Sequence, residues 1–334
     1  MPRKKKIANI DDIYRQAAIH ELAGEFAKAE SAYRQALAIR TNPGGWGLLG
    51  RTLALQGKYR EGLAAAKKMR SAALKYRSHS LLAIADCLMG RVHHDAGRMV
   101  LAEKYYRESL EAKARPETEI FLGHLLNLQG RSIEAKMSYQ RALHIDPQNP
   151  EARYNLAVWY KTHKDYERTV KHFRKILETN AGYADTHQQL AMALWHFGST
   201  GINQAKELLE EALTEDIKNV EKHLFLAMTY RLLNKAKDAE REFQFILDEL
   251  TPDSRTYILY ADFLAEKTRR HDEAQSFFRK AIEAAPDNGA AHYYYGKFLL
   301  NNDCREEAEE VLNKAAQLGF EKAEMLIENV SEIE

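Results

Sequence analysis

The residues of this chain that could do chemistry are thirteen histidines and two cysteines, and their spacing argues against a reactive centre. His93 and His94 are adjacent, so on a helix their side chains would diverge by roughly 100° and could not easily share a metal ion. Cys87 and Cys304 lie far apart without metal-like spacing, which predicts neither a zinc site nor a disulfide. No phosphate-binding glycine loop or Ser-His-Asp set stands out. The sequence therefore predicts a protein that is not an enzyme and has no metal or cofactor.

Charge is the second chemical feature, and it is unevenly distributed along the chain. Residues 1–115 hold 22 lysines and arginines against 11 acidic residues, a net charge of +11, whereas the remainder holds 27 against 37, a net charge of −10. A basic segment can meet nucleic-acid phosphates, an acidic protein surface or the acidic end of another copy. Aromatic side chains placed to stack on bases are not evident here, which argues against nucleic acid and leaves a protein surface or a solvated face without a partner as the open alternatives. The candidate electrostatic contacts are Arg51, Lys67, Lys68, Arg70 and Arg91.

The elements that would position these residues follow from a repeat. A small residue recurs at intervals of 33 to 40 residues, most often about 34, and a second small-residue series runs in step with it. A period of this length predicts short supersecondary units that stack on one another to form a common core. The first series is Ala17, Gly50, Gly90, Gly123, Ala157, Ala191, Ala227, Ala261 and Gly296.

One unit, residues 116–149, shows how the repeat is built. Two segments with apolar residues at helical spacing are separated by Gly130, which permits the positive φ that ends a helix. Pro147 stops the second segment. The pattern predicts a helix–turn–helix unit in which Gly123 lets the two helices approach closely, while Tyr139 fills the space between neighbouring units.

These units resemble the tetratricopeptide repeat family. Residues that fit the family pattern are Trp46, Leu49, Gly50, Gly57, Tyr59, Leu156, Tyr160, Tyr166, Phe173, Pro147 and Pro286. The resemblance covers about residues 10–321 as nine units. It implies an all-α, right-handed superhelical solenoid that acts as a non-catalytic adaptor or scaffold.

The resemblance also sets the expected domain organisation. A basic N-terminal tail occupies residues 1–9, and a single solenoid spans residues 10–321, with a longer inter-repeat segment near residues 76–82. Residues 322–334 are expected to form a C-terminal capping helix, because terminal repeats need a polar outer face.

In this family the first helices of successive units line a concave face. Mapping that face predicts an apolar groove suited to a peptide or an amphipathic helix of a partner protein, with Trp195 as the anchor. The alternative is that some of these side chains belong to the core. The predicted groove residues are Tyr154, Val158, Met192, Trp195, Leu224, Met228 and Ile258.

Three functions remain open from the sequence. The preferred hypothesis is an adaptor that binds a protein or peptide, and self-association through oppositely charged ends is a further option. The second is a nucleic-acid-associated regulatory subunit that uses the basic third. The third is the recognition subunit of a separate catalytic chain. No apolar run reaches the length of a membrane span and no signal peptide is recognised, so no membrane contact and a cytoplasmic location are expected.

Overall fold

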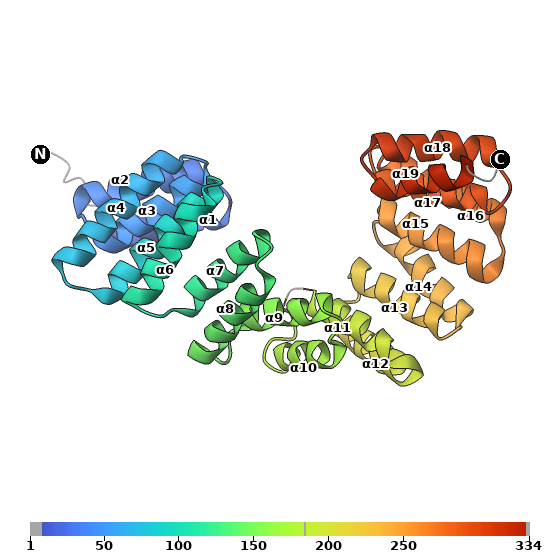
Figure 1. Ribbon diagram of the computed structural model, residues 1–334, viewed down its shortest axis with the longest axis horizontal. Coiled ribbons are helices and arrows are strands. Elements are labelled where there is room, and N and C mark those ends of the chain that lie inside the picture. Colours follow the sequence, from blue (N-terminus) through green and yellow to red (C-terminus); the bar gives the residue numbers. More distant parts are fainter. Residues whose placement is uncertain (1–8, 184, 332–334) are drawn as a thin grey trace, which may run out of the picture. The chain divides into compact units, whose positions relative to one another are not determined.

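The computed structural model of the chain describes residues 9–183 and 185–331, and within these ranges the only regular secondary structure is helical. The helices gather into two compact units, Met1–His163 and Lys164–Glu334, and Figure 1 shows successive helices within each unit lying against one another. Most of the predicted N-terminal tail, residues 1–8, and the last three residues of the predicted cap lie outside the described residues.

The first unit contains nine α-helices in its described part. Helices α4 and α5 have 17 residues each, whereas the others have 13 or 14. The extra residues near 76–82 therefore lengthen two helices, and only a short turn separates these helices. The helices are α1 (Ile10–Leu22), α2 (Phe26–Ile39), α3 (Pro43–Leu55), α4 (Tyr59–Lys75), α5 (His79–Asp95), α6 (Met99–Ala112), α7 (Pro116–Leu128), α8 (Ser132–Ile145) and α9 (Pro150–Thr162).

The second unit continues the alternation of first and second helices and ends on an additional helix. Counted over the described residues, α1–α18 follow one another as nine first and nine second helices, which confirms the predicted all-α repeat array. The remaining elements are α10 (Tyr166–Leu177), α11 (Thr186–Leu194), the 3-10 helix η1 (Trp195–Phe197), α12 (Gly198–Glu215), α13 (Val220–Leu232), α14 (Ala236–Glu249), α15 (Ser254–Phe263), the π-helix η2 (Leu264–Thr268), α16 (His271–Ala284), α17 (Gly289–Leu300), α18 (Arg305–Gln317) and α19 (Glu321–Ser331).

Local sequence signals set where these helices begin and end. The Asn42 side chain caps α3 by accepting the Gly45 N–H at 2.6 Å, and Pro43 occupies the first turn, where its missing N–H costs nothing. Gly130 turns the chain between α7 and α8 with φ at +74°, as its position predicted. Several corresponding turns of the second unit use non-glycine residues with positive φ, such as Asn234 and Arg269, although Gly198 keeps a glycine at the start of α12. This explains why the glycine signal fades in the later repeats.

The core of each repeat depends on the close approach that the small residues allow. A methyl group on Gly123 would lie 2.5 Å from Cε1 of Tyr139, and one on Gly90 would lie 2.5 Å from Cδ1 of Tyr106. Both tyrosine rings are almost completely buried. The ring of the second helix therefore lies directly on the backbone of the first, and any side chain at the glycine position would have to displace it.

The last helix, α19, covers the apolar end of the second unit. Ala323 is fully buried in a cluster with Leu312 and Ala315 of α18, and Leu326 and Ile327 pack against the same cluster. The side chains on the other face, including Met325, are exposed. This one-sided burial is what a capping helix requires. In the part of the chain that the structure describes, no helix combines the length and the apolar character needed to cross a membrane.

We predict opposite effects for alanine at two helical glycines. Gly123→Ala should lower the free energy of unfolding by about 1–3 kcal/mol, because the methyl group overpacks the Tyr139 ring. Gly44→Ala should raise it by about 0.5–1 kcal/mol, because a methyl group there meets only Asn42 Oδ1, at 3.4 Å, while alanine favours the helix. Urea denaturation followed by circular dichroism measures both. Equal effects would contradict the packing described above.

A second prediction concerns the cap. Ala323→Gln should destabilise the chain by about 1–3 kcal/mol, because a buried amide without partners loses its hydrogen bonds to water. Met325→Gln, on the exposed face of the same helix, is the matched control and should change stability by less than about 0.5 kcal/mol. Thermal melting of the two variants compares them. Identical melting curves would show that α19 is not docked as described.

Candidate functional site

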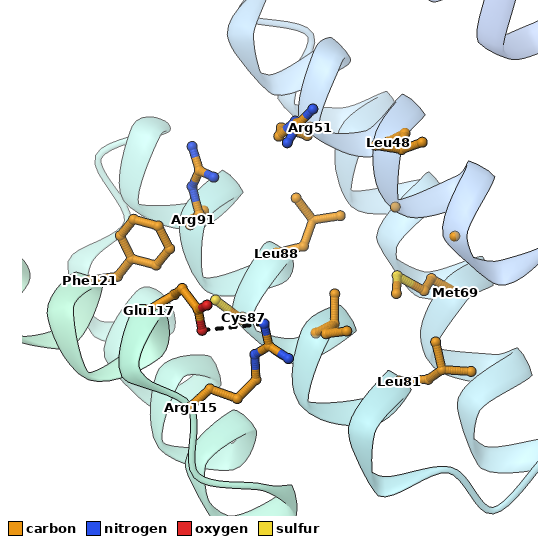
Figure 2. Close-up of a pocket in the computed structure, with 13 residues that line it drawn as sticks. Leu48, Arg51, Met69, Leu81, Cys87, Leu88, Arg91, Arg115, Glu117 and Phe121 are labelled. Atoms are coloured by element: carbon orange, nitrogen blue, oxygen red, sulfur yellow. Dashed lines mark ion pairs between the residues drawn. The ribbon is translucent and has the colours of Figure 1, made fainter. Parts of the chain in front are cut away.

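A cleft of about 560 Å³ opens on the first unit, on the face formed by the first helices α3, α5 and α7 (Figure 2). We refer to it as the first-unit cleft. It is lined by Gly44, Gly47, Leu48, Arg51, Met69, Leu81, Ile84, Cys87, Leu88, Arg91, Arg115, Glu117 and Phe121.

The cleft exists because two small residues occupy a position that is filled elsewhere. Three residues before the close-contact position, the later repeats carry large side chains such as Ile120, Leu224 and Ile258, and all three are buried. The second and third repeats carry Gly47 and Cys87 at this position. A Cβ on Gly47 would lie 2.9 Å from Met69 Sδ, so the Met69 side chain of α4 takes the space next to this glycine, and the cleft opens beside it.

The floor of the cleft is apolar. Leu48, Ile84 and Leu88 come from the first helices α3 and α5, and Met69 reaches the cleft from α4. Burial raises the pKa of the Cys87 thiol, so this side chain stays neutral and contributes to the apolar lining. The floor would therefore favour an apolar side chain of a ligand.

Arginines from three successive repeats stand around this floor, and two of them already have carboxylate partners. Arg51 donates two hydrogen bonds to Glu21, at 2.9 and 3.0 Å. Arg115 forms an ion pair with Glu117 at 3.3 Å, the interaction drawn as a dashed line in Figure 2. Both positive charges are therefore partly neutralised within the chain.

The third arginine is held differently. The Arg91 guanidinium lies over the Phe121 ring, with Cζ 4.8 Å from the ring centroid. Among the described residues, Arg91 has no hydrogen bond or ion pair to a carboxylate. The cation–π contact orients the guanidinium without neutralising its charge.

The predicted apolar groove requires a correction. Leu224 is fully buried and Ile258 is 6% exposed, and both belong to the core of the second unit. The prediction that they line a groove is wrong, because this position packs between the first helices of neighbouring repeats. The other predicted groove residues are half-buried. Tyr154 and Val158 lie in the first unit, and Met192, Trp195 and Met228 lie in the second.

Trp195, the predicted anchor, is engaged by its own neighbours. It lies in η1, its indole N–H donates to Thr229 Oγ1 at 3.1 Å, and its ring stacks near Phe225 with centroids 5.9 Å apart. These contacts join the end of the first helix α11 to the next first helix, α13. The side chain therefore contributes to packing between repeats.

The five residues predicted to make electrostatic contacts lie in three different environments. Arg51 and Arg91 line the first-unit cleft. Lys67 and Lys68 are exposed on α4. The Nζ atom of Lys68 lies 3.9 Å from the centroid of the Trp46 ring. Arg70 is not a free surface charge, because its Nε donates to the buried carboxylate of Asp86 at 2.5 Å. Its assignment as a partner contact is therefore corrected to a structural ion pair.

Sequence reasoning missed Met69, Leu81, Arg115 and Phe121, which reach the cleft from outside the positions assigned to the concave face. A usable signal was nonetheless present. Gly44 and Gly47 stand in a helix interior or first turn, where glycine costs up to about 1 kcal/mol relative to alanine, and both face the cleft. Met69 packs against Gly47, with its Sδ 2.9 Å from where a Cβ would lie, whereas Gly44 has only Asn42 Oδ1 nearby and marks the open side of the cleft.

The known proteins to which this chain is similar are built from the same kind of helical repeat. Tetratricopeptide repeat profiles match residues 13–45 and 263–325, and a TPR repeat profile matches residues 123–163. Among solved structures, yeast Tom70 aligns with a TM-score of 0.55 at 12% identity, over 96% of this chain and 95% of that one. A tetratricopeptide repeat protein from Parabacteroides merdae aligns with a TM-score of 0.51 at 15% identity, over 87% and 98%.

Curated relatives are more distant. The human protein O-mannosyl-transferase TMTC3 is 23% identical over 219 residues, which cover 64% of this chain and 24% of that protein. The chain thus spans about a quarter of the length of the curated relatives that it matches. With repeat profiles at the beginning, middle and end of the chain and tetratricopeptide solenoids among its structural neighbours, the chain belongs to the tetratricopeptide repeat family.

Proposed function

We propose that the chain is a non-catalytic adaptor whose first-unit cleft holds a peptide segment of a partner protein. The observation that carries this proposal is the first-unit cleft itself, a cavity of about 560 Å³ at the two repeats that carry Gly47 and Cys87 where several other repeats place a large buried side chain. Met69 of α4 fills the space directly at Gly47, and the cleft beside it provides room for a ligand.

The size and lining of the cleft support a peptide as the occupant. Ligand pockets commonly measure about 300–1,000 Å³ and combine an apolar lining with a few polar groups. The first-unit cleft falls in this range, with an apolar floor and arginines at its edge. It accommodates one or two large side chains, while the helix face around it offers a surface along which an extended or helical segment could lie.

Two features of the cleft support binding without catalysis. Its carboxylate, Glu117, is engaged by Arg115, and the raised pKa of Cys87 disfavours the nucleophilic thiolate. The transferase activity named for TMTC3 belongs to a protein about four times longer than the matched part.

The nucleic-acid alternative takes second place for a specific reason. Among the cations that supported it, Arg70 is bound to Asp86, and Lys68 lies over Trp46. A human IFIT1 dimer with PPP-AAAA aligns with a TM-score of 0.51 at 16% identity, over 98% of this chain and 82% of that one, which shows a shared fold. The peptide proposal therefore rests on more of this chain's own geometry.

We predict that Gly44→Leu blocks the cleft without unfolding the chain, since nothing but Asn42 lies near a Cβ at this position. Random 12-residue peptides displayed on phage are selected on the wild-type chain and then measured by fluorescence anisotropy. The selected peptides should carry large apolar residues and lose at least tenfold in affinity on Gly44→Leu, which is about 1.4 kcal/mol.

Two controls locate the effect. Ala18→Leu adds the same side chain at an exposed position of α1 outside the cleft and should leave affinity unchanged. Trp195→Ala, in the second unit, should lower thermal stability, because it removes the contacts to Thr229 and Phe225, and should leave peptide affinity within about twofold. Peptides that bind Gly44→Leu as well as the wild type would place the binding surface elsewhere.

A further inference from the structure

We propose that the second unit carries a separate binding surface, a groove between the second helices α10 and α12, and that this groove binds a basic amphipathic helix of a partner protein. The residues that line it belong to α10, α11, η1 and α12, so it shares nothing with the first-unit cleft. We refer to it as the α10–α12 groove.

The groove consists of two adjoining cavities, one of about 470 Å³ at the starts of the two helices and one of about 420 Å³ toward their ends. Helices α10 and α12 form the walls, and both pack on α11, which forms the floor (Figure 1). Leu194 lines both cavities, so the floor is shared. Between them, Arg174 Nη2 donates a hydrogen bond to Gln204 Oε1 at 2.9 Å, which joins the two walls.

The interior of the groove is apolar. On the α12 side the wall of the first cavity is low, because it is made by Thr200 and Gly201. A Cβ on Gly201 would clash with the carbonyl oxygen of Leu194, so the backbone of α12 lies directly on the end of α11 there. Phe197 lines the same cavity and is 42% exposed, which leaves apolar surface in contact with water. The apolar lining residues are Val170, Leu177, Leu190, Leu194, Phe197 and Leu208.

The spacing along the walls favours a helix as the occupant. On α10, Val170 lines the first cavity and Leu177 the second, seven residues later. On α12, Gly201 and Leu208 do the same at the same spacing. Seven residues of an α-helix span about 10.5 Å. A helix laid along the groove therefore places its side chains i and i+7 in the two cavities, and a small residue midway passes the hydrogen bond that joins the walls.

The edges of the groove determine the charge of that helix. Glu167 on α10 and Glu207 and Glu211 on α12 are exposed, and among the described residues their carboxylates form no ion pair and accept no hydrogen bond. A fourth carboxylate, Glu178, and one cation, Arg174, complete the charged lining. Uncompensated negative charge beside an apolar groove favours a helix that carries lysines or arginines on both sides of its apolar stripe.

The charge of the whole second unit supports the same partner. Residues 164–334 hold 22 lysines and arginines against 32 acidic residues, a net charge of −10. A negative field accelerates the approach of a basic segment and disfavours an acidic one. The basic helix of this chain, α4, already packs on α3 and α5 within its own unit. A helix of a separate protein, rather than α4 of a second copy, is therefore the occupant.

The test begins with a library of helical peptides. Phage-displayed peptides of about 15 residues, with an alanine-rich frame that favours the helix and one randomised face, are selected on the Gly44→Leu chain. This variant blocks the first-unit cleft, so peptides that bind there are not recovered. Selected peptides are labelled with fluorescein and titrated by anisotropy. We expect large apolar residues at i and i+7, lysines or arginines beside them, and affinity that falls as salt is raised.

Two tryptophan substitutions locate the binding. Thr200→Trp fills the cavity at the start of α12 and should weaken the selected peptides at least tenfold. Ser199→Trp adds the same side chain at the adjacent exposed position, which does not line the groove, and should leave affinity within about twofold. Circular dichroism and thermal melting establish that both variants fold like the parent chain.

A charge reversal tests the edges. Glu207→Lys combined with Glu211→Lys should weaken the basic peptides at least tenfold and should favour versions in which their basic residues are replaced by glutamate. Glu306→Lys combined with Glu310→Lys, an exposed pair at the same spacing on α18, is the matched control and should leave affinity within about twofold. Both double variants change the total charge equally, so a difference between them reports a local contact.

Four results would overturn the inference. A selection that yields no binding peptide would leave the groove without an occupant, and peptides insensitive to the charge reversal would show that its edges play no part. Equal affinity of Thr200→Trp and Ser199→Trp would place the binding elsewhere. Dimers of the chain in sedimentation velocity that Glu207→Lys with Glu211→Lys dissociates would identify a second copy as the occupant. None of these results affects the first-unit cleft, which is tested by selection on the wild type.

Discussion

In the third and fourth repeats, contact between a glycine backbone and a tyrosine ring sets the distance between the two helices. Where Gly123 faces Tyr139, the ring lies on the first helix itself, and the same contact joins Gly90 to Tyr106. Because this contact fixes how the first helix is rotated, it also fixes which of its residues point toward the neighbouring repeat. The side chain three residues earlier, Ile120, is 1% exposed and is buried with Ala142 of the second helix α8 and Ala152 of the next first helix, α9.

The first-unit cleft is a local departure from that rule. With Gly47 and Cys87 at the inward-directed position, the first helices still pack on α4 and α6, Met69 of α4 takes the space beside Gly47, and a cleft stays open next to it. A repeat array can thus acquire a ligand site by losing side chains at one register position while the rest of its packing stays the same. The arginines around the opening then supply the polar contacts that an apolar cavity lacks.

Much of the fold could be predicted because small residues recur about every 34 residues, which fixes the length of the repeat. The recurrence of small residues and the turn at Gly130 gave the helix pairs, and Pro147 marked the end of α8. The prediction for Leu224 failed because helical spacing distinguishes faces about 100° wide, which is too coarse to separate a groove residue from one wedged between helices. The ion pair between Arg70 and Asp86 was not predictable, because its partners lie on different helices and share no repeat position.

The first turn of α3 has a consequence for how the cleft behaves as a whole. Its sequence, Pro-Gly-Gly-Trp-Gly, has little intrinsic tendency to form a helix, and the turn is held by Asn42, which caps Gly45 and also donates to the Tyr14 hydroxyl of α1 at 2.7 Å. One wall of the cleft is therefore ordered through a contact with the first repeat. Order in the first repeat and occupancy of the cleft are then thermodynamically linked, and this linkage is reciprocal. A molecule that bound α1 and displaced Tyr14 would weaken the cleft without touching it, and a peptide in the cleft would tighten the first repeat to the same extent.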